Sequence, residues 1–240
     1  MENLEKILDS NDPEKINDFL ISLSKNPEEI SSDLFNFILK NLDSNTLEKI
    51  KMNFIFLLGE IGKIKKIDDN FYTYLIDSYF DSDRWVRDEI LGAFIKISYF
   101  FPPNEDLVEL LSFAINEDYF PLKKKALDLL NLIEKVPLDI INKLFKNLDV
   151  PDSVIVDKIM NIFKKNIKNQ KELMEFLNYS ENYKVLNNSI IRTLLINYVH
   201  SINNLSELRS SVQNCNWNEK FKNLLINESK IYEKILLKRA

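Results

Sequence analysis

Glycine is scarce in this sequence of 240 residues, which contains three where average usage would give about 17. Tight β-turns, phosphate-binding loops and β-sandwiches depend on glycine wherever the backbone must take a positive φ angle. Gly59, Gly62 and Gly92 all lie in segments whose apolar residues recur at helical spacing. The shortage therefore excludes a P-loop or a dinucleotide-binding fold and predicts an all-α chain. In segment 58–62 we expect glycine to permit close packing of two helices or to mark a helix end.

Cysteine and histidine occur once each, as Cys215 and His200. One cysteine excludes an intramolecular disulfide, and together the two residues exclude a multi-cysteine or histidine-rich metal centre. Cys215 has no neighbouring base in the segment 214–217, so we interpret it as a structural or incidental thiol. His200 ends an apolar helical segment, and we interpret it as a capping or surface residue. We expect no catalytic residue, no metal and no cofactor.

Long hydrophobic runs are missing as well. The longest ones, such as residues 54–58, fall far short of the roughly 20 residues that a membrane-spanning helix needs, so we expect no membrane span. The first ten residues, MENLEKILDS, are acidic and lack the apolar stretch of a secretory signal. We therefore expect a cytoplasmic protein.

Positive charge is in the minority, with a formal net charge of −5. Residues 1–50 carry five Lys against eleven Asp or Glu, whereas residues 201–240 carry seven Lys or Arg against four Glu. An acidic chain is a poor non-specific binder of nucleic acid, whose affinity comes mainly from phosphate neutralisation. Local lysine clusters are open to two interpretations, a solvated helix end or a binding patch. They are Lys63/Lys65/Lys66, Lys123/Lys124/Lys125 and Lys164/Lys165/Lys168.

What the sequence does contain is a repeat. When residues 46–65, 82–101 and 118–137 are aligned with a shift of 36, offsets 0, 4, 7, 8 and 11 mark one face of a helix. A preceding helix repeats with the same shift, so the unit is a helix, a turn, a second helix and a linker. All fifteen aligned positions are apolar: Ile50, Phe54, Leu57, Leu58, Ile61, Val86, Ile90, Ala93, Phe94, Ile97, Leu122, Ala126, Leu129, Leu130 and Ile133.

The repeat continues beyond residue 137 with shifts of 33 and 32. Proline and cap residues lie between the periodic segments, as expected for short helices in antiparallel hairpins. The terminal segments have fewer apolar residues, which is what the ends of an open stack of repeats require. We expect one domain over 1–240, with approximate repeats at 1–25, 27–66, 68–101, 104–136, 137–168 and 169–203 and capping helices at 204–239.

The segment DSDRWVRDEILGAFIKI, residues 81–97, resembles the second helix of a HEAT repeat. In that family an acidic turn precedes a Val-Arg pair and a small apolar residue, here Asp81, Asp83, Val86–Arg87 and Ile90. The resemblance is sharp in three units and weaker after residue 150, where Val156 replaces the basic residue. It implies an all-α fold, an α-solenoid of about six HEAT-like helical hairpins in the armadillo/HEAT class.

Two polar columns run through the aligned repeats. Asn45, Asp81 and Glu117 form a turn column at a spacing of 36, and Lys51, Arg87 and Lys123 form a cation column six residues further on. The resemblance implies that such columns form ladders of ion pairs along the solenoid. Partly exposed pairs are each worth about 0–1 kcal/mol, so their expected benefit is register more than stability. A ligand-binding role for Arg87 is the alternative.

The same resemblance implies where a partner would bind, because second helices line the concave surface of HEAT proteins. Some positions there are not required by the core, and the apolar ones are either an interaction site or packing against a neighbour. Trp85 either shields a repeat junction or contributes to binding. We expect a non-enzymatic adaptor or scaffold that binds another protein or peptide segment, as a subunit of a larger complex. The candidate residues are Met52, Phe56, Trp85, Asp88, Ile95, Lys124 and Asp128.

The alternative function is nucleic-acid binding of the alkylpurine DNA glycosylase type. Those HEAT-like enzymes use Trp and Asp on a basic concave face, and Trp85 with Asp88 is similar. Two features oppose it, since the chain is acidic and the other tryptophan, Trp217, lies far along the sequence. HEAT-repeat di-iron hydroxylases need several His-Glu pairs, and this sequence has none.

Overall fold

The computed structural model describes residue 7 and residues 10–179, 186–201 and 205–237. These residues form thirteen α-helices and two short 3-10 helices, with no β-strand among them. The prediction of an all-α chain is therefore confirmed. Of the first expected repeat, residues 1–25, positions 1–6, 8 and 9 lie outside the described residues.

The chain divides into two compact units, Met1–Leu132 and Ile133–Ala240. The first contains α2 (Pro13–Leu23), η1 (Pro27–Glu29), α3 (Ser32–Asn41), α4 (Ser44–Gly62), α5 (Asp69–Phe80), α6 (Arg84–Ile97), α7 (Glu105–Ala114) and α8 (Phe120–Leu132). The second contains α9 (Leu138–Lys146), η2 (Asn147–Asp149), α10 (Ser153–Asn166), α11 (Gln170–Tyr179), α12 (Asn188–Ser201), α13 (Leu205–Asn214) and α14 (Glu219–Leu237).

Short polar side chains start many of these helices. Four N-cap aspartates, Asp12, Asp43, Asp83 and Asp152, each accept hydrogen bonds from two backbone amides in the first turn of their helix. Amides of the first turn have no acceptor within the helix itself. The amide of Thr46 in particular holds the pKa of the Asp43 carboxyl below its usual value. These aspartates therefore fix where the chain enters each helix.

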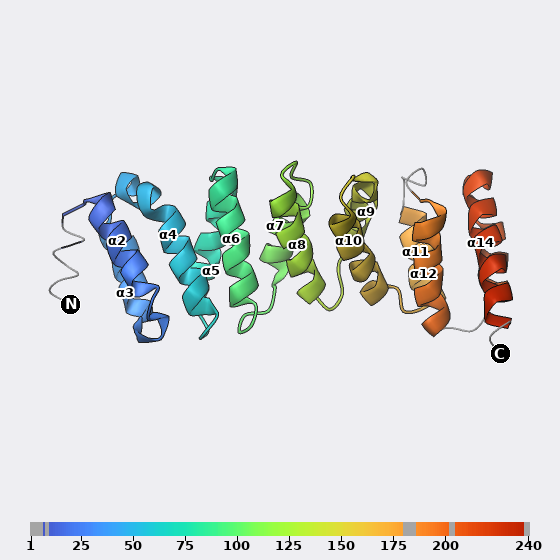
Figure 1. The fold of residues 1–240 in the computed structure, drawn as a ribbon, viewed down its shortest axis with the longest axis horizontal. Coiled ribbons are helices and arrows are strands. Elements are labelled where there is room, and N and C mark those ends of the chain that lie inside the picture. Colours follow the sequence, from blue (N-terminus) through green and yellow to red (C-terminus); the bar gives the residue numbers. More distant parts are fainter. Residues whose placement is uncertain (1–6, 8–9, 180–185, 202–204, 238–240) are drawn as a thin grey trace. The chain divides into compact units, whose positions relative to one another are not determined.

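Within the first unit the helices lie in two layers. Helices α2, α4, α6 and α8 contact one another in series, whereas α5 contacts α7. Helix α5 also packs on α6, and α7 on α8, as the two arms of a hairpin. Figure 1 shows α6 and α8 towards the viewer with α5 and α7 behind them.

The aligned apolar face forms the core between the layers. Thirteen of its fifteen positions are buried, and only Val86 and Ile133 are half-buried. The preceding helices contribute Phe35, Phe71 and Leu107, all at most 2% exposed. The helical period found in the sequence therefore identified the buried side chains of this core.

Helices α4 and α6 approach each other closely at two glycines. A Cβ atom built on Gly62 would lie 2.3 Å from Cγ1 of Ile97, and one on Gly59 would lie 3.0 Å from Cα of Ala93. None of the three glycines has a positive φ angle, so backbone conformation does not require glycine there. Gly59 and Gly62 instead leave space for the backbone and side chains of α6. Close helix packing was one of the two roles expected for segment 58–62, and Gly62 is also the last residue of α4.

Hydrogen bonds link consecutive hairpins at about the repeat spacing. Asn53 donates to Asn17 at 2.9 Å across 36 residues, and Asn70 donates to Asn36 at 2.9 Å across 34. In the second unit, Lys165 Nζ donates to the carbonyl of Ile133 at 2.6 Å across 32. The repeat therefore places polar groups, as well as apolar side chains, opposite one another in consecutive hairpins.

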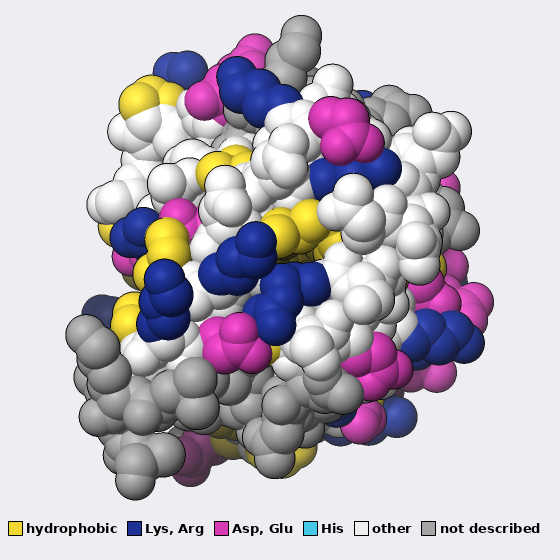
Figure 2. All heavy atoms as spheres, turned by 90° about the vertical axis from the view of Figure 1, so that its right-hand side faces the viewer, with side chains coloured by type: hydrophobic (Ala, Val, Ile, Leu, Met, Phe, Trp, Pro, Cys, Tyr) yellow, Lys and Arg dark blue, Asp and Glu magenta, His cyan; other side chains and the backbone are white. Residues whose placement is uncertain are grey.

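The second unit is held by its own contacts, among them α10 with α12, α12 with α14 and α9 with α11. Trp217 is 9% exposed and its Nε1 donates to Asn178 Oδ1 at 2.7 Å, which ties α11 to the segment before α14. Arg192 pairs with the buried Glu228 at 2.6 Å. Figure 2 views the α14 end, where basic and acidic side chains surround small hydrophobic patches.

Candidate protein-binding surface

Two apolar candidates of α4 lie on its exposed side. Met52 is 43% exposed and Phe56, one turn further on, is 37% exposed. The ammonium group of Lys96 lies 4.6 Å from the centroid of the Phe56 ring and forms a 2.8 Å ion pair with Glu60. The lysine from α6 therefore covers part of the ring and leaves the rest in contact with water.

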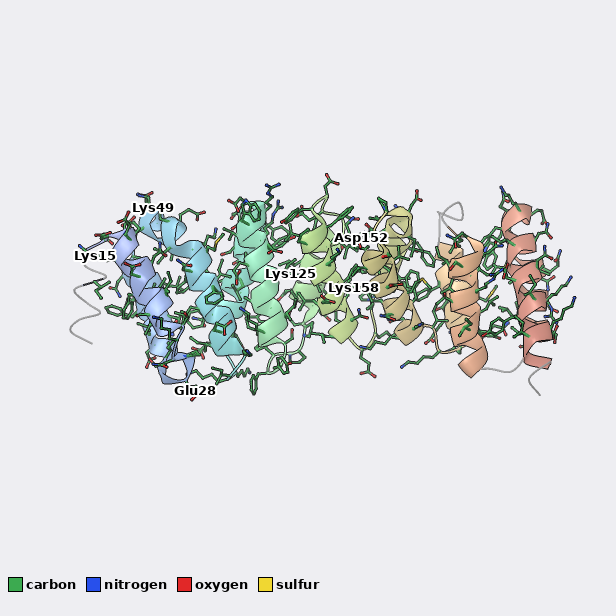
Figure 3. The ribbon with its side chains drawn as sticks, viewed as in Figure 1. Lys15, Glu28, Lys49, Lys125, Asp152 and Lys158 are labelled. Carbon is green, nitrogen blue, oxygen red and sulfur yellow. The ribbon has the colours of Figure 1, made fainter. Side chains whose placement is uncertain are left out.

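Asp88 is held by a lysine of the next hairpin. Lys125 Nζ on α8 lies 2.9 Å from the Asp88 carboxylate and 2.8 Å from the Asp88 backbone oxygen. Figure 3 labels Lys125 among the side chains of the first unit. A Cβ on Gly92 would lie 3.3 Å from the same Nζ, so this glycine leaves room for the lysine to reach back. The pairs Glu60–Lys96 and Asp88–Lys125 thus link α4 to α6 and α6 to α8.

Trp85 belongs to a small aromatic and cationic cluster at the start of α6. Its side chain is 51% exposed, and its ring meets the edge of Tyr119 at a centroid distance of 6.0 Å. The guanidinium of Arg84 lies 4.8 Å from the Trp85 ring and 5.4 Å from the Tyr119 ring. We call these three residues the Trp85 cluster. It contacts the segment before α8 and still presents half of the tryptophan to water.

Sequence reasoning missed Arg84 and Tyr119. At a shift of 36 Tyr119 aligns with Asp83, which is the N-cap of α6, so the alignment marked it as a cap position. Tyr119 also lies outside the apolar face that repeats along the helices. The signal that was available is composition alone, since Tyr119 and Phe120 place two aromatic residues beside the turn.

The remaining predicted contact residues are less open. Ile95 on α6 is half-buried, as are Lys124 and Asp128 on α8. Lys124 and Asp128 both take part in further side-chain interactions, so neither is free. The exposed apolar part of this surface therefore comprises Met52, Phe56 and Trp85.

One of the expected cross-repeat ion pairs is present. Arg87 forms a 2.8 Å ion pair with Glu117, and the hydroxyl of Tyr79 donates to the same carboxylate oxygen at 3.3 Å. Burial, together with the charge of Glu117, raises the pKa of Tyr79 above its usual value. Arg87 thus links α6 to the turn before α8, which is a structural contact.

The other members of the two polar columns have different surroundings. Lys51 pairs at 3.2 Å with Glu48, three residues before it on the same helix. Lys123 is 7% exposed, and its burial lowers its pKa while Asp118 opposes the shift. Among the described residues, Asn45 and Asp81 form no ion pair or side-chain hydrogen bond with the cation column, and both are exposed.

Residues that carry chemistry are not gathered into a site. Within the described ranges, no group of three or more His, Cys, Asp or Glu could hold a metal ion. Burial raises the pKa of the Cys215 thiol, which donates a hydrogen bond to the backbone oxygen of Ser211 at 3.3 Å. The side chain of His200 lies outside the described residues. None of the described helices combines the length and apolarity needed to cross a membrane.

Comparisons with known proteins reveal a likeness of fold. No family model matches the chain, and no curated protein sequence matches it. Two crystal structures of engineered proteins from the Northeast Structural Genomics Consortium are similar, each with a TM-score of 0.53 over 95% of this chain. The first is 16% identical over 96% of its own length, and the second is 14% identical over 68%. At these identities the likeness shows the helical arrangement alone.

Proposed function

We propose that this protein is a HEAT-like α-solenoid that acts as a non-enzymatic adaptor or scaffold and binds a segment of another protein along α4, α6 and α8. The observation that carries the proposal is the exposure of Met52, Phe56 and Trp85 on helices whose core faces are already buried. Large apolar side chains that the fold does not use tend to mark interaction surfaces.

The surroundings of these side chains suit a protein segment. Tryptophan and arginine are the residues most enriched at binding hot spots, and the Trp85 cluster contains both. Around the apolar residues lie the ion pairs Glu60–Lys96 and Asp88–Lys125, which are 24–30% exposed. An apolar centre with a polar rim of both signs is the usual composition of a protein interface.

Site-specific crosslinking tests this proposal. We would place a photoreactive phenylalanine analogue at Phe56 or Trp85, irradiate cells that express the chain and identify crosslinked species by mass spectrometry. We expect the same partner protein from both positions. The control is Tyr99, which is 81% exposed in the segment after α6 and lies outside the proposed surface. Crosslinks of equal yield from Tyr99, or none from positions 56 and 85, would contradict the proposal.

The DNA glycosylase-like alternative is supported by one feature, the exposed Trp85 beside Arg84, which offers a ring and a cation to a base. It is opposed by Asp88, whose carboxylate is engaged by Lys125, and by Trp217, which is buried. Release of methylated purines from duplex DNA distinguishes the two functions. Trp85→Ala and Asp88→Asn would both abolish that release in a glycosylase, and an adaptor shows no release at all.

A further inference from the structure

A groove lies between α5 and α7, the first helices of two consecutive hairpins. It has a volume of about 340 Å³ and is lined by apolar Ile76, Phe80 and Leu110 and by acidic Asp77, Asp106 and Glu109. We call it the α5–α7 groove. It lies in the layer of the first unit that does not contain α4, α6 and α8.

Two exposed phenylalanines give the groove its apolar end. Phe80 is 51% exposed and Phe113 is 54% exposed, and their rings meet edge to face at a centroid distance of 5.4 Å. The repeat core does not need them, because the core positions of these helices are filled by residues such as Leu75 and Leu111, which are fully buried. A pair of adjacent, half-exposed rings is an apolar surface in contact with water.

The acidic side of the groove carries carboxylates that form no ion pair with the described residues. Within the described residues, no Lys or Arg forms an ion pair with Asp77, Asp106 or Glu109. Three carboxylates beside one apolar groove set up a negative potential that attracts a positively charged partner and selects against a negative one. They are also not a metal site, since no group of three acidic residues among the described ones could hold a metal ion.

The length of the groove accommodates two turns of a helix. Its lining runs from Thr73 to Phe80 on α5 and from Asp106 to Phe113 on α7 when both rings are included. Each of these stretches covers seven residue steps, which at a rise of 1.5 Å per residue is about 10 Å along the helix axis, or two helical turns. Grooves of this kind bind amphipathic helices through apolar side chains spaced at i, i+3 or i+4, and i+7.

We propose that the α5–α7 groove binds a basic amphipathic helix from a partner protein. Its apolar side chains would pack on Phe80, Phe113 and Ile76, and its Lys or Arg side chains would pair with Asp77, Asp106 and Glu109. This goes beyond the proposed function, because it assigns a second surface on the other helix layer and specifies the chemistry of what binds there.

The test uses the full chain and a synthetic probe. The probe is a fluorescein-labelled helical peptide of about 15 residues, with Leu at i, i+4 and i+7 and Lys at the flanking positions. Two peptides serve as controls, one with Glu in place of Lys and one with Ser in place of Leu. We expect fluorescence anisotropy to show saturable binding of the Leu/Lys peptide alone. Equal binding of the Ser/Lys peptide would overturn the proposal, since the site would then be purely electrostatic.

Groove variants localise the binding. Asp77→Asn/Asp106→Asn/Glu109→Gln should weaken Kd on the order of tenfold, as expected for three exposed ion pairs. The matched control, Glu14→Gln/Asp18→Asn/Asp33→Asn, removes the same charge from α2 and α3 and should leave Kd unchanged. Phe80→Ala should also weaken binding, whereas Tyr99→Ala should not. Equal losses in the variant and in its control would mean general attraction to an acidic chain and would overturn the proposal.

Two further measurements keep the outcome independent of the proposed function. Methyl NMR should show shifts at Ile76 and Leu110 on peptide addition and none at Ile21, which is 49% exposed on α2. Light scattering should give the same mass for the chain with and without the triple groove substitution. If the chain self-associates and this substitution abolishes the self-association, the groove is an interface between copies of the chain. That result would overturn the proposal that it binds a partner protein. Crosslinking at Phe56 and Trp85 does not depend on the groove, so either proposal can fail alone.

Discussion

Gly62 and Gly92 are the same residue type in opposite surroundings. A Cβ on Gly62 would overlap the buried side chain of Ile97, which is 1% exposed. A Cβ on Gly92 would lie 3.3 Å from the end of the Lys125 side chain and 4.0 Å from Oε1 of Glu89. Extra atoms in a packed core force side chains and backbone to move, whereas alanine within an open helix is favoured over glycine.

The two glycines therefore give a matched pair of substitutions. We expect Gly62→Ala to lower the free energy of unfolding by about 1–3 kcal/mol, because α4 and α6 must move apart. Gly92→Ala should be neutral or stabilising by up to about 1 kcal/mol, because it lies in the middle of α6. Urea unfolding followed by circular dichroism measures both. Equal effects of the two substitutions would show that the close contact at Gly62 does not limit packing.

Single residues also show how far sequence reasoning reaches. Core positions follow from helical periodicity, because a face that repeats three times has to be buried. The partner of a charged side chain does not follow, because it depends on rotamers and on the exact rise between hairpins. Lys51 pairs with Glu48, within reach on its own helix, whereas Arg87 reaches the next turn at Glu117. Lys51 and Arg87 occupy equivalent positions in the aligned repeats, but they form ion pairs with different kinds of partner.

At the scale of an element, the turn before α6 contains two aspartates with different surroundings. Asp83 is the N-cap and accepts hydrogen bonds from the amides of Trp85 and Val86 at 2.9 and 3.0 Å. Asp81 is the C-cap residue of α5, and its side chain forms no hydrogen bond or ion pair with the described part of the chain. The HEAT resemblance treats both as parts of one acidic turn.

Alanine substitutions separate these two aspartates. Asp83→Ala should cost about 1 kcal/mol, because two amides of the first turn lose their acceptor. For a chain of this size that corresponds to about 2–4 °C in Tm. Asp81→Ala should change Tm by much less, and differential scanning calorimetry would record both. A larger loss for Asp81→Ala would instead support its predicted role in a polar ladder.

Proline and cap residues, which the sequence places between the periodic segments, mark several helix beginnings. Asp12 with Pro13 and Asp152 after Pro151 mark the starts of α2 and α10. The segment from Asn26 to Glu29 carries the same pattern but forms only the 3-10 helix η1, and α3 begins at Ser32. A cap and a proline favour a first turn, but the helix continues only where the following residues bury an apolar face.

At the scale of the whole molecule, stability is distributed along the chain. Every substantial contact between helices joins elements close in sequence, such as α4 with α6 or α12 with α14. The two compact units, Met1–Leu132 and Ile133–Ala240, each have their own buried residues. In such arrangements stability is close to a sum of local terms and nearest-neighbour terms, so parts of the chain can open separately.

The candidate binding surfaces show the limit of prediction at this scale. Repeat register together with the HEAT resemblance predicted Met52, Phe56 and Trp85 as contact residues on α4 and α6. It gave no sign of the α5–α7 groove, because Phe80 and Phe113 are spaced by 33 residues and Asp77, Asp106 and Glu109 share no repeat position. A groove arises from the separation of two helices in space, which depends on side-chain volumes in the core beneath it.

Local stability leads to a prediction for hydrogen exchange in the full chain. Gly62→Ala should speed amide exchange in α4 and α6 first, and next in α2 and α8, which pack against them. Helices α12–α14 should keep the protection of the unsubstituted chain, because they belong to the other compact unit. Trp217→Phe removes the Nε1 donor to Asn178 and should have the reverse pattern, with faster exchange in α11 and α14. Hydrogen–deuterium exchange with mass spectrometry resolves these segments, and Gly92→Ala is the control. Equal acceleration of all helices by either substitution would mean that the chain opens as one cooperative body, and the local account of its stability would fail.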